Sequence, residues 1–206
     1  ILPPSDRDLV LLEALPEVNQ EYKERYGIDH FLKGIQGGLA LRKRQVFEPT
    51  CTICGLTAGY QGQGSKTVLP ARASAKVDFR LIPEQTPEQV LEALRIHLDR
   101  EGFQDVKIDY LGGGPPARTD PDHPFVQLTV KTAGEIYQQP MALVPLTGGS
   151  GPNYPFVHTL GLPVVTAGIG YPGSNAHAPN ENIRVDLYLK GAAHIARILQ
   201  AFGENK

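Results

Sequence analysis

A histidine in a short polar loop is the first residue of this chain that could do chemistry. His177 lies in the segment 174–181, directly after the apolar run 163–168. Such a run is typical of a buried strand, and a loop that follows a strand can reach a cleft. A neutral imidazole is a common zinc ligand, so His177 is a candidate metal ligand. The same pattern also fits a loop histidine with no chemical role.

Two further features could bind a carboxylate. Gly148 and Gly149 would let a ligand approach the backbone, and Ser150 could begin a helix whose free N–H groups suit an anion. A capped helix after a tight turn is the alternative. Arg80 lies on the polar face of an alternating strand, and its guanidinium suits a carboxylate, although pairing with Asp78 is the alternative.

Two other motifs do not support the functions that they first suggest. The glycine-rich loop 59–67 differs from a phosphate-binding loop, because Ser65 separates its last glycine from the lysine and a strand follows instead of a helix. Cys51 and Cys54 have the spacing of a zinc or redox pair, but they lie on a predicted strand and no second cysteine pair exists. We interpret them as two reduced thiols.

The elements that position these residues fall into two groups, separated by the glycine-proline run 112–116. Before it, the pattern predicts loosely helical structure over 6–31 and strands at 49–58, 73–82 and 106–110. The strand at 73–82 alternates as a half-buried strand does. Thr86, Pro87 and Gln89 predict a helix start, and Gly102 predicts its end. This order is typical of an α+β domain with an antiparallel sheet.

After the glycine-proline run, helices and strands alternate. The pattern predicts a helix over 123–137 that is capped by Asp122, a strand at 142–144, a helix over 150–160 and a strand at 163–168. A last helix begins near Asp186. This order is typical of an α/β domain in which helices cover a sheet.

Composition narrows the classes of function. The 206 residues are 41% hydrophobic and 20% charged, as in a globular protein. The net charge of -2 gives no electrostatic reason to expect nucleic acid or an anionic membrane as a partner. No apolar run could span a bilayer, no signal peptide is recognised, and we expect a cytoplasmic protein. Because the chain begins at Ile1 and its only methionine is Met141, we expect a piece of a longer polypeptide.

Four motifs, taken in order, resemble one enzyme family. They are the segments 66–70, 76–83, 148–150 and 177–181. Their order is similar to the C-terminal part of the dinuclear-zinc family of acetylornithine deacetylase, succinyl-diaminopimelate desuccinylase, glutamate carboxypeptidase and carnosinase-like dipeptidases. The segments 48–50, 55–56 and 62–67 resemble the nonspecific dipeptidase branch most.

The resemblance implies a fold and a set of site residues. It places residues 1–115 in an α+β lid and dimerisation domain that lacks its N-terminal part. It places residues 116–206 in the C-terminal part of an α/β zinc-peptidase catalytic domain. It implies the following roles: His177 as a zinc ligand, Arg80 and Ser150 with the Gly148 and Gly149 backbone as carboxylate-binding groups, and Thr67 as a lid residue near the substrate.

The resemblance also implies an incomplete active site. The family's N-terminal half supplies the other metal ligands and the general base, so we expect no catalytic residue and no stably bound metal in this chain. We expect the C-terminal portion of a metal-dependent dipeptidase that cleaves short peptides with a free C-terminal carboxylate. The whole protein would hold two divalent ions, with zinc favoured over manganese, and would form a homodimer through the lid. The alternatives are an N-acyl amino acid deacylase and a non-catalytic dimerisation module.

Overall fold

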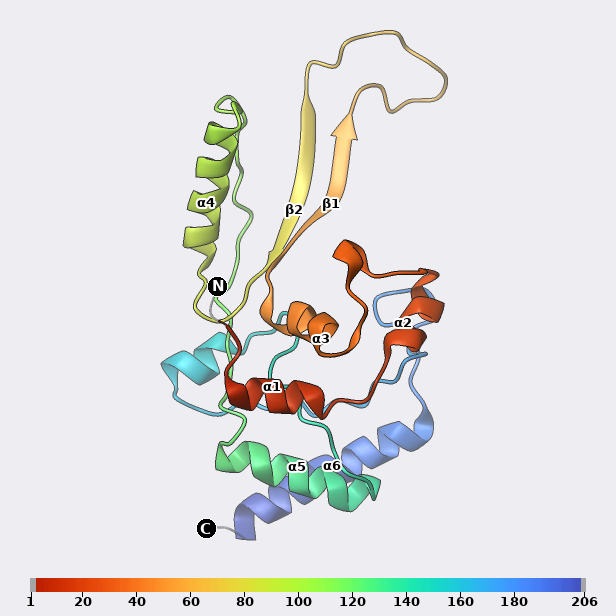
Figure 1. The fold of residues 1–206 in the computed structure, drawn as a ribbon, viewed down its shortest axis with the longest axis vertical. Helices are drawn as coiled ribbons and strands as arrows, with labels where there is room; N and C mark the ends of the chain where they lie inside the picture. Colours follow the sequence, from red (N-terminus) through yellow and green to blue (C-terminus); the bar gives the residue numbers. More distant parts are fainter. Residues whose placement is uncertain (1–2, 205–206) are drawn as a thin grey trace.

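The computed structural model describes residues 3–204, and Figure 1 shows their arrangement. A β-hairpin and a helix rise from a group of short helices, and two long helices lie at the opposite end of the molecule. The elements in chain order are α1 (Asp6–Glu13), α2 (Asn19–Tyr26), a 3-10 turn η1 (Leu32–Gly34), α3 (Gly38–Phe47), β1 (Thr50–Ala58), β2 (Ala73–Arg80), α4 (Pro87–Arg100), α5 (Pro124–Tyr137), a π-type turn η2 (Pro155–Thr159) and α6 (Val185–Glu204).

Short helices α1 and α3 pack together around a small apolar core. Ser5 begins α1 with a capping box, in which the Asp8 amide donates to the Ser5 hydroxyl and the Asp8 carboxylate accepts from the Ser5 amide. Arg42 of α3 donates to Leu12 O at 2.9 Å and to Pro16 O at 2.8 Å, which satisfies carbonyls at the end of α1. The buried apolar side chains here are Leu11, Leu12, Phe31, Leu41 and Phe47.

The sequence predicted a single loosely helical region over 6–31, but the structure has two helices there and a third that was not predicted. The chain leaves the helical conformation at 14–18, around Pro16, and α2 ends at Gly27 with a φ of 60°. The third helix, α3, begins after Gly37, whose φ is 111°. Its N-cap makes no side-chain hydrogen bond, so no capping signal marked its start.

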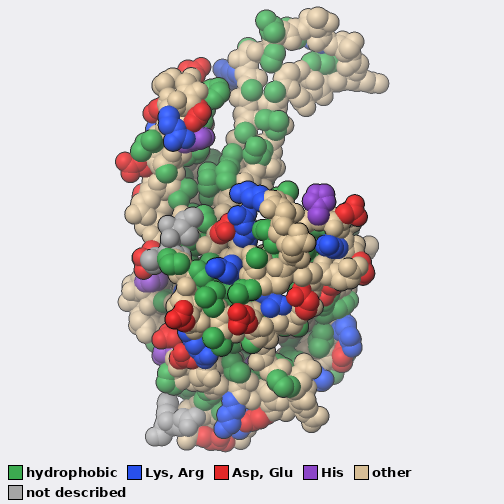
Figure 2. Space-filling view, in the orientation of Figure 1, with side chains coloured by type: hydrophobic (Ala, Val, Ile, Leu, Met, Phe, Trp, Pro, Cys, Tyr) green, Lys and Arg blue, Asp and Glu red, His purple; other side chains and the backbone are tan. Residues whose placement is uncertain are grey.

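Strands β1 and β2 form an antiparallel hairpin, with partners running from Thr50–Arg80 to Ala58–Ala73 and a bulge at Cys54. The predicted half-burial of β2 is wrong. Both strands are exposed along nearly their whole length, and Ile53 and Leu56 are 66% and 73% exposed. The reason is that the sheet contains only these two strands among residues 3–204. Figure 2 shows hydrophobic side chains at the surface between the hairpin and α4.

The predicted boundaries of α4 are confirmed. Thr86 and Gln89 form a capping box, Pro87 lies in the first turn, and Gly102 lies just beyond the end. The strand predicted at 106–110 is wrong. That segment returns alongside α4 and is held by Arg95, which donates to Val106 O at 2.7 Å. Alternating side chains favour a strand, but a strand also needs a partner for its backbone, and this segment has no ladder partner within the described structure.

Helices α5 and α6 pack against each other. Both were predicted from the sequence, and the structure confirms them. Their contact buries Val126, Ala133, Ile198 and Ala201. His194, also buried, lies within hydrogen-bond distance of Thr129 O and the Thr132 hydroxyl. The predicted cap of α5 is corrected: His123 accepts from the Phe125 amide, whereas Asp122 pairs with Arg7.

The remaining predictions for the second half are corrected. Residues 142–144 and 163–168 are not strands in the described chain, and the helix predicted over 150–160 is reduced to η2. The two segments lack a neighbouring strand with which to pair, although the Val164 amide donates to the Thr119 hydroxyl at 2.8 Å. None of the helices within residues 3–204 has the length and apolar character needed to cross a membrane.

Candidate functional site

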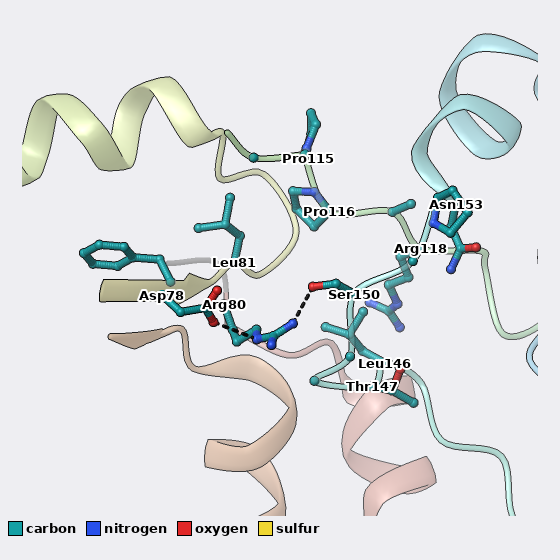
Figure 3. Close-up of a pocket in the computed structure, with 18 of the residues that line it drawn as sticks. Asp78, Arg80, Leu81, Pro115, Pro116, Arg118, Leu146, Thr147, Ser150 and Asn153 are labelled. Carbon is teal, nitrogen blue, oxygen red and sulfur yellow. Dashed lines mark hydrogen bonds and ion pairs between the residues drawn. The ribbon is translucent and has the colours of Figure 1, made fainter. Parts of the chain in front are cut away.

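A groove of about 2400 Å³ runs between the hairpin, α4 and α5. Its walls are β2, the apolar face of α4, part of α5 and the extended segments 105–119, 141–153 and 164–170. Figure 3 shows the polar side chains that gather at one end of it, where β2 ends and the segment 146–153 passes. Both polar and apolar groups line the groove.

Arg80, the last residue of β2, connects the hairpin to this end of the groove. Its Nη1 donates a short hydrogen bond to the Ser150 hydroxyl, and its Nε lies 3.0 Å from the Asp78 carboxylate (Figure 3). The sequence left two roles open for Arg80, and the Asp78 pairing is now observed together with the Ser150 contact. Residues 70 positions apart are thereby joined, and two of the predicted carboxylate-binding side chains lie in contact.

Gly148 and Gly149 also line this end of the groove. The helix expected to begin at Ser150 is absent, so helix N-terminal amides do not contribute to anion binding here. A Cβ atom on Gly149 would meet nothing within 4 Å, and one on Gly148 would approach only Gln45 O at 3.9 Å. Packing within the chain therefore does not require either glycine, and the missing side chains leave the backbone open to a ligand.

A second arginine in the groove, Arg118, was not found by sequence reasoning (Figure 3). Both terminal nitrogens of Arg118 donate to the carboxylate of Asp8, a residue that is only 2% exposed. The guanidinium also lies 5.7 Å from the centre of the Phe47 ring. Burial raises the pKa of the Asp8 carboxyl, but hydrogen bonds from Arg118 and Ser5 outweigh burial and hold that pKa below its ordinary value. No sequence signal linked these residues, because 110 positions separate them.

His177 lies in an exposed loop outside the walls of the groove. Asn175, His177 and Asn180 all adopt left-handed backbone conformations, with φ of 53°, 63° and 62°. Asn182 closes the loop: its side-chain amide donates to Gly173 O and Asn180 O at 3.1 and 3.0 Å. The loop that carries His177 therefore has a defined conformation, but the imidazole is not brought to Arg80 and Ser150.

Thr67 is likewise separated from the other predicted site residues. It lies in the exposed loop 59–72 at the tip of the hairpin and is not among the residues that line the groove (Figure 1). The structure thus brings together Arg80, Ser150, Gly148 and Gly149, but not Thr67 or His177. The roles assigned to all six residues stay predictions.

The side chains of the described residues do not by themselves form a complete metal site. Within residues 3–204, no three His, Cys, Asp or Glu side chains lie close enough together to hold a metal ion. His177 has the donor chemistry of one ligand, whereas a catalytic zinc usually takes three protein ligands. Cys51 and Cys54 are both free and exposed and do not complete such a set.

Comparison with known proteins places this arrangement in a family context. The chain is 26% identical over 149 residues to the Cys-Gly metallodipeptidase dug1 of Schizosaccharomyces pombe, an alignment that covers 69% of this chain and 31% of that protein. Residues 13–201 match the model of peptidase family M20/M25/M40. The chain therefore spans about a third of the length of the curated relatives it matches.

Solved structures agree with the sequence comparison. An M20 family metallo-carboxypeptidase from Sulfolobus solfataricus has a TM-score of 0.85 and 33% identity, covering 97% of this chain and 45% of that one. The di-peptidase Dug1p of Saccharomyces cerevisiae has the same fold, with a TM-score of 0.84 and 21% identity, covering 99% and 43%. The relatives are metal-dependent peptidases, which implies divalent metal ions for the family. The match over residues 13–201 shows that the chain belongs to peptidase family M20/M25/M40.

Proposed function

We propose that the whole protein is a metal-dependent dipeptidase in which Arg80 and Ser150 bind the C-terminal carboxylate of the substrate. The observation that carries the proposal is the contact between the Arg80 guanidinium and the Ser150 hydroxyl at one end of the groove. A guanidinium offers paired donors that match a carboxylate, and a hydroxyl can add another donor. The names of the relatives support a dipeptidase, since three of them are Cys-Gly metallodipeptidases.

Arg80 is better suited to this role than Arg118. Both terminal nitrogens of Arg118 already donate to the buried Asp8 carboxylate. If Asp8 left this buried position, Arg118 would lose its partner, which is costly. Arg80 is 45% exposed at its side chain, and its partner Asp78 contacts only one edge of the guanidinium. The other edge contacts Ser150, and Gly148 and Gly149 line the same groove.

The remaining parts of the proposal concern the whole protein. His177 holds one of two divalent ions, with zinc favoured over manganese, and the other ligands come from outside residues 3–204. Residues 1–115 belong to a lid that forms the homodimer, and Thr67 in that lid lies near the substrate. Residues 116–206 belong to the catalytic domain. The exposed hairpin supports a role in pairing, because unpaired strand edges are available for another chain.

Arg80→Lys in the whole protein tests the carboxylate assignment. The ammonium of lysine cannot reproduce two-point recognition, so KM for a dipeptide should rise about tenfold. KM for the same dipeptide with an amidated C-terminus should change little. The matched control is Arg25→Lys, since Arg25 pairs with Glu21 on α2 away from the groove. Equal losses on the two substrates would mean that Arg80 serves the fold.

The same assay separates the dipeptidase from the N-acyl amino acid deacylase. Both classes of substrate present a free carboxylate to Arg80, so turnover must be compared on dipeptides and on N-acyl amino acids at equal concentrations. A dipeptidase should cleave the dipeptides with the higher kcat/KM. Faster cleavage of the N-acyl amino acids would contradict the proposal while leaving the carboxylate site intact.

A further inference from the structure

Asp78 forms an ion pair with Arg80 at the end of β2, with 3.0 Å between its carboxylate and the Arg80 Nε. Asp78 and Arg80 are two positions apart on β2, so their side chains leave the same face of the strand. Their partners across the hairpin are Thr52 and Thr50, which carry no charge. Both Asp78 and Arg80 line the groove.

The guanidinium of Arg80 is held from two sides. Asp78 forms an ion pair with Nε, at 3.0 Å, and the Ser150 hydroxyl, from a different part of the chain, accepts a hydrogen bond from Nη1. Figure 3 shows the two partners on opposite sides of the guanidinium. A planar fork fixed at two nitrogens cannot rotate freely, so its remaining donors keep a constant direction in the groove.

The exposure of the Arg80 and Asp78 side chains indicates that their ion pair orients Arg80 more than it stabilises the fold. The side chains of Arg80 and Asp78 are 45% and 50% exposed. Ion pairs at such exposure contribute little to folding, because water screens the attraction and two side chains lose rotamer freedom. The same loss of freedom is useful at a binding site, since an arginine already in position loses less entropy when a ligand arrives.

We propose that Asp78 is a positioning residue: it fixes the Nε edge of Arg80 so that the terminal nitrogens of the guanidinium face the carboxylate of the substrate. Asp78 does not touch the substrate and acts only through Arg80. Ser150 occupies Nη1 before the substrate binds, and its hydroxyl then turns to donate to the incoming carboxylate. This inference rests on the proposed role of Arg80.

Asp78→Asn in the whole protein tests the inference, because it keeps the shape of the side chain and removes its charge. KM for a free dipeptide should rise about tenfold, as expected when the ion pair that orients the guanidinium is lost, and kcat should stay unchanged. KM for the C-terminal amide should not move. Asp78→Glu keeps the negative charge and can still form an ion pair with Arg80, so it should restore most of the binding.

A matched control variant and a double variant test whether the effect of Asp78→Asn acts through Arg80. Asp99→Asn removes a carboxylate from a similar exposed pair, with Arg95 on α4, and should leave KM unchanged. In an Arg80→Ala background, Asp78→Asn should have no further effect on KM, because a residue that acts through Arg80 has nothing left to position. An additive loss in the double variant would overturn the inference.

The outcomes also separate this inference from the function on which it rests. If Arg80→Ala does not selectively weaken binding of the free carboxylate, the proposed function of Arg80 fails. If Arg80→Ala does so but Asp78→Asn leaves KM unchanged, only the positioning role of Asp78 fails. A lower KM in Asp78→Asn would also overturn it, since it would mean that Asp78 competes with the substrate for Arg80.

Discussion

At the scale of single residues, His177 combines an exposed side chain with a left-handed backbone conformation. We expect His177→Ala in the whole protein to abolish peptide hydrolysis and to weaken metal binding, because the substitution removes the proposed metal ligand. The melting temperature of the metal-free protein should hardly change, since substitutions at exposed positions usually alter stability by no more than about 0.5 kcal/mol. Activity assays, metal titration and thermal unfolding measure the three effects.

His30→Ala is the matched control for this prediction, because His30 is another exposed histidine and does not line the groove. It should leave activity, metal affinity and melting temperature unchanged. Full activity of His177→Ala would reject the ligand assignment. A large drop in melting temperature with retained metal affinity would mean instead that His177 is a structural residue of its loop.

Sequence motifs selected residues that the structure brings into contact, whereas a pair that only the fold brings together was missed. Arg80 and Ser150 were selected from their types and from the order of motifs, and the structure joins them across 70 positions. The Asp8–Arg118 pair was missed, because nothing in the local sequence marks either residue. In the sequence Asp8 lay only within the loosely helical region 6–31, and a buried pair depends on how distant segments pack.

At the scale of elements, the Asp8–Arg118 pair ties α1 to the segment that leads into α5, and Arg7–Asp122 makes a second, exposed tie at 2.6 Å. We expect Asp8→Asn to lower the free energy of unfolding by about 2 kcal/mol at neutral pH, because hydrogen bonds between two charged groups are weakened. Asp122→Asn should cost far less, since that pair is exposed. Chemical denaturation of the two variants compares these effects directly.

The pH dependence of the Asp8 effect has a defined sign. The folded-state pKa of Asp8 lies below the ordinary carboxyl value of 3.8, so the folded state binds the proton less readily than the unfolded state. Its contribution to stability is therefore fully present above that ordinary value and is lost as pH falls through the folded-state pKa. The difference between the wild type and Asp8→Asn should shrink as the solution becomes strongly acidic. A constant difference would contradict the assignment.

Elements with local signals were predicted, whereas elements that depend on a distant partner were not. Helix α4 has its cap residues in sequence, and α6 has a continuous apolar stripe, so both follow from their own residues. The hairpin β1–β2 also has its partner nearby. The segments 106–110, 142–144 and 163–168 have strand-like composition, yet composition cannot supply the neighbour that a strand needs.

At the scale of the whole molecule, much apolar surface is uncovered. Large hydrophobic side chains are exposed on the hairpin and along α6, where Leu189 and Leu199 are 60% and 69% exposed. Exposed strand edges and contiguous apolar surface both favour association. The chain also spans less than half of the solved relatives whose fold it shares, so those relatives contain structure with no counterpart here.

The last prediction concerns the 206-residue chain by itself, which we expect to be inactive and to bind no stoichiometric zinc. A single imidazole at His177 cannot hold a catalytic zinc, and residues 3–204 offer no cluster of metal ligands around it. The proposed carboxylate site at Arg80 would still allow a substrate to bind, but binding without a metal-activated nucleophile gives no hydrolysis. Metal analysis, a dipeptide hydrolysis assay and light scattering should therefore show a metal-free, inert and self-associated chain. Bound zinc together with turnover would prove that the chain completes an active site, through its own residues or those of a second copy.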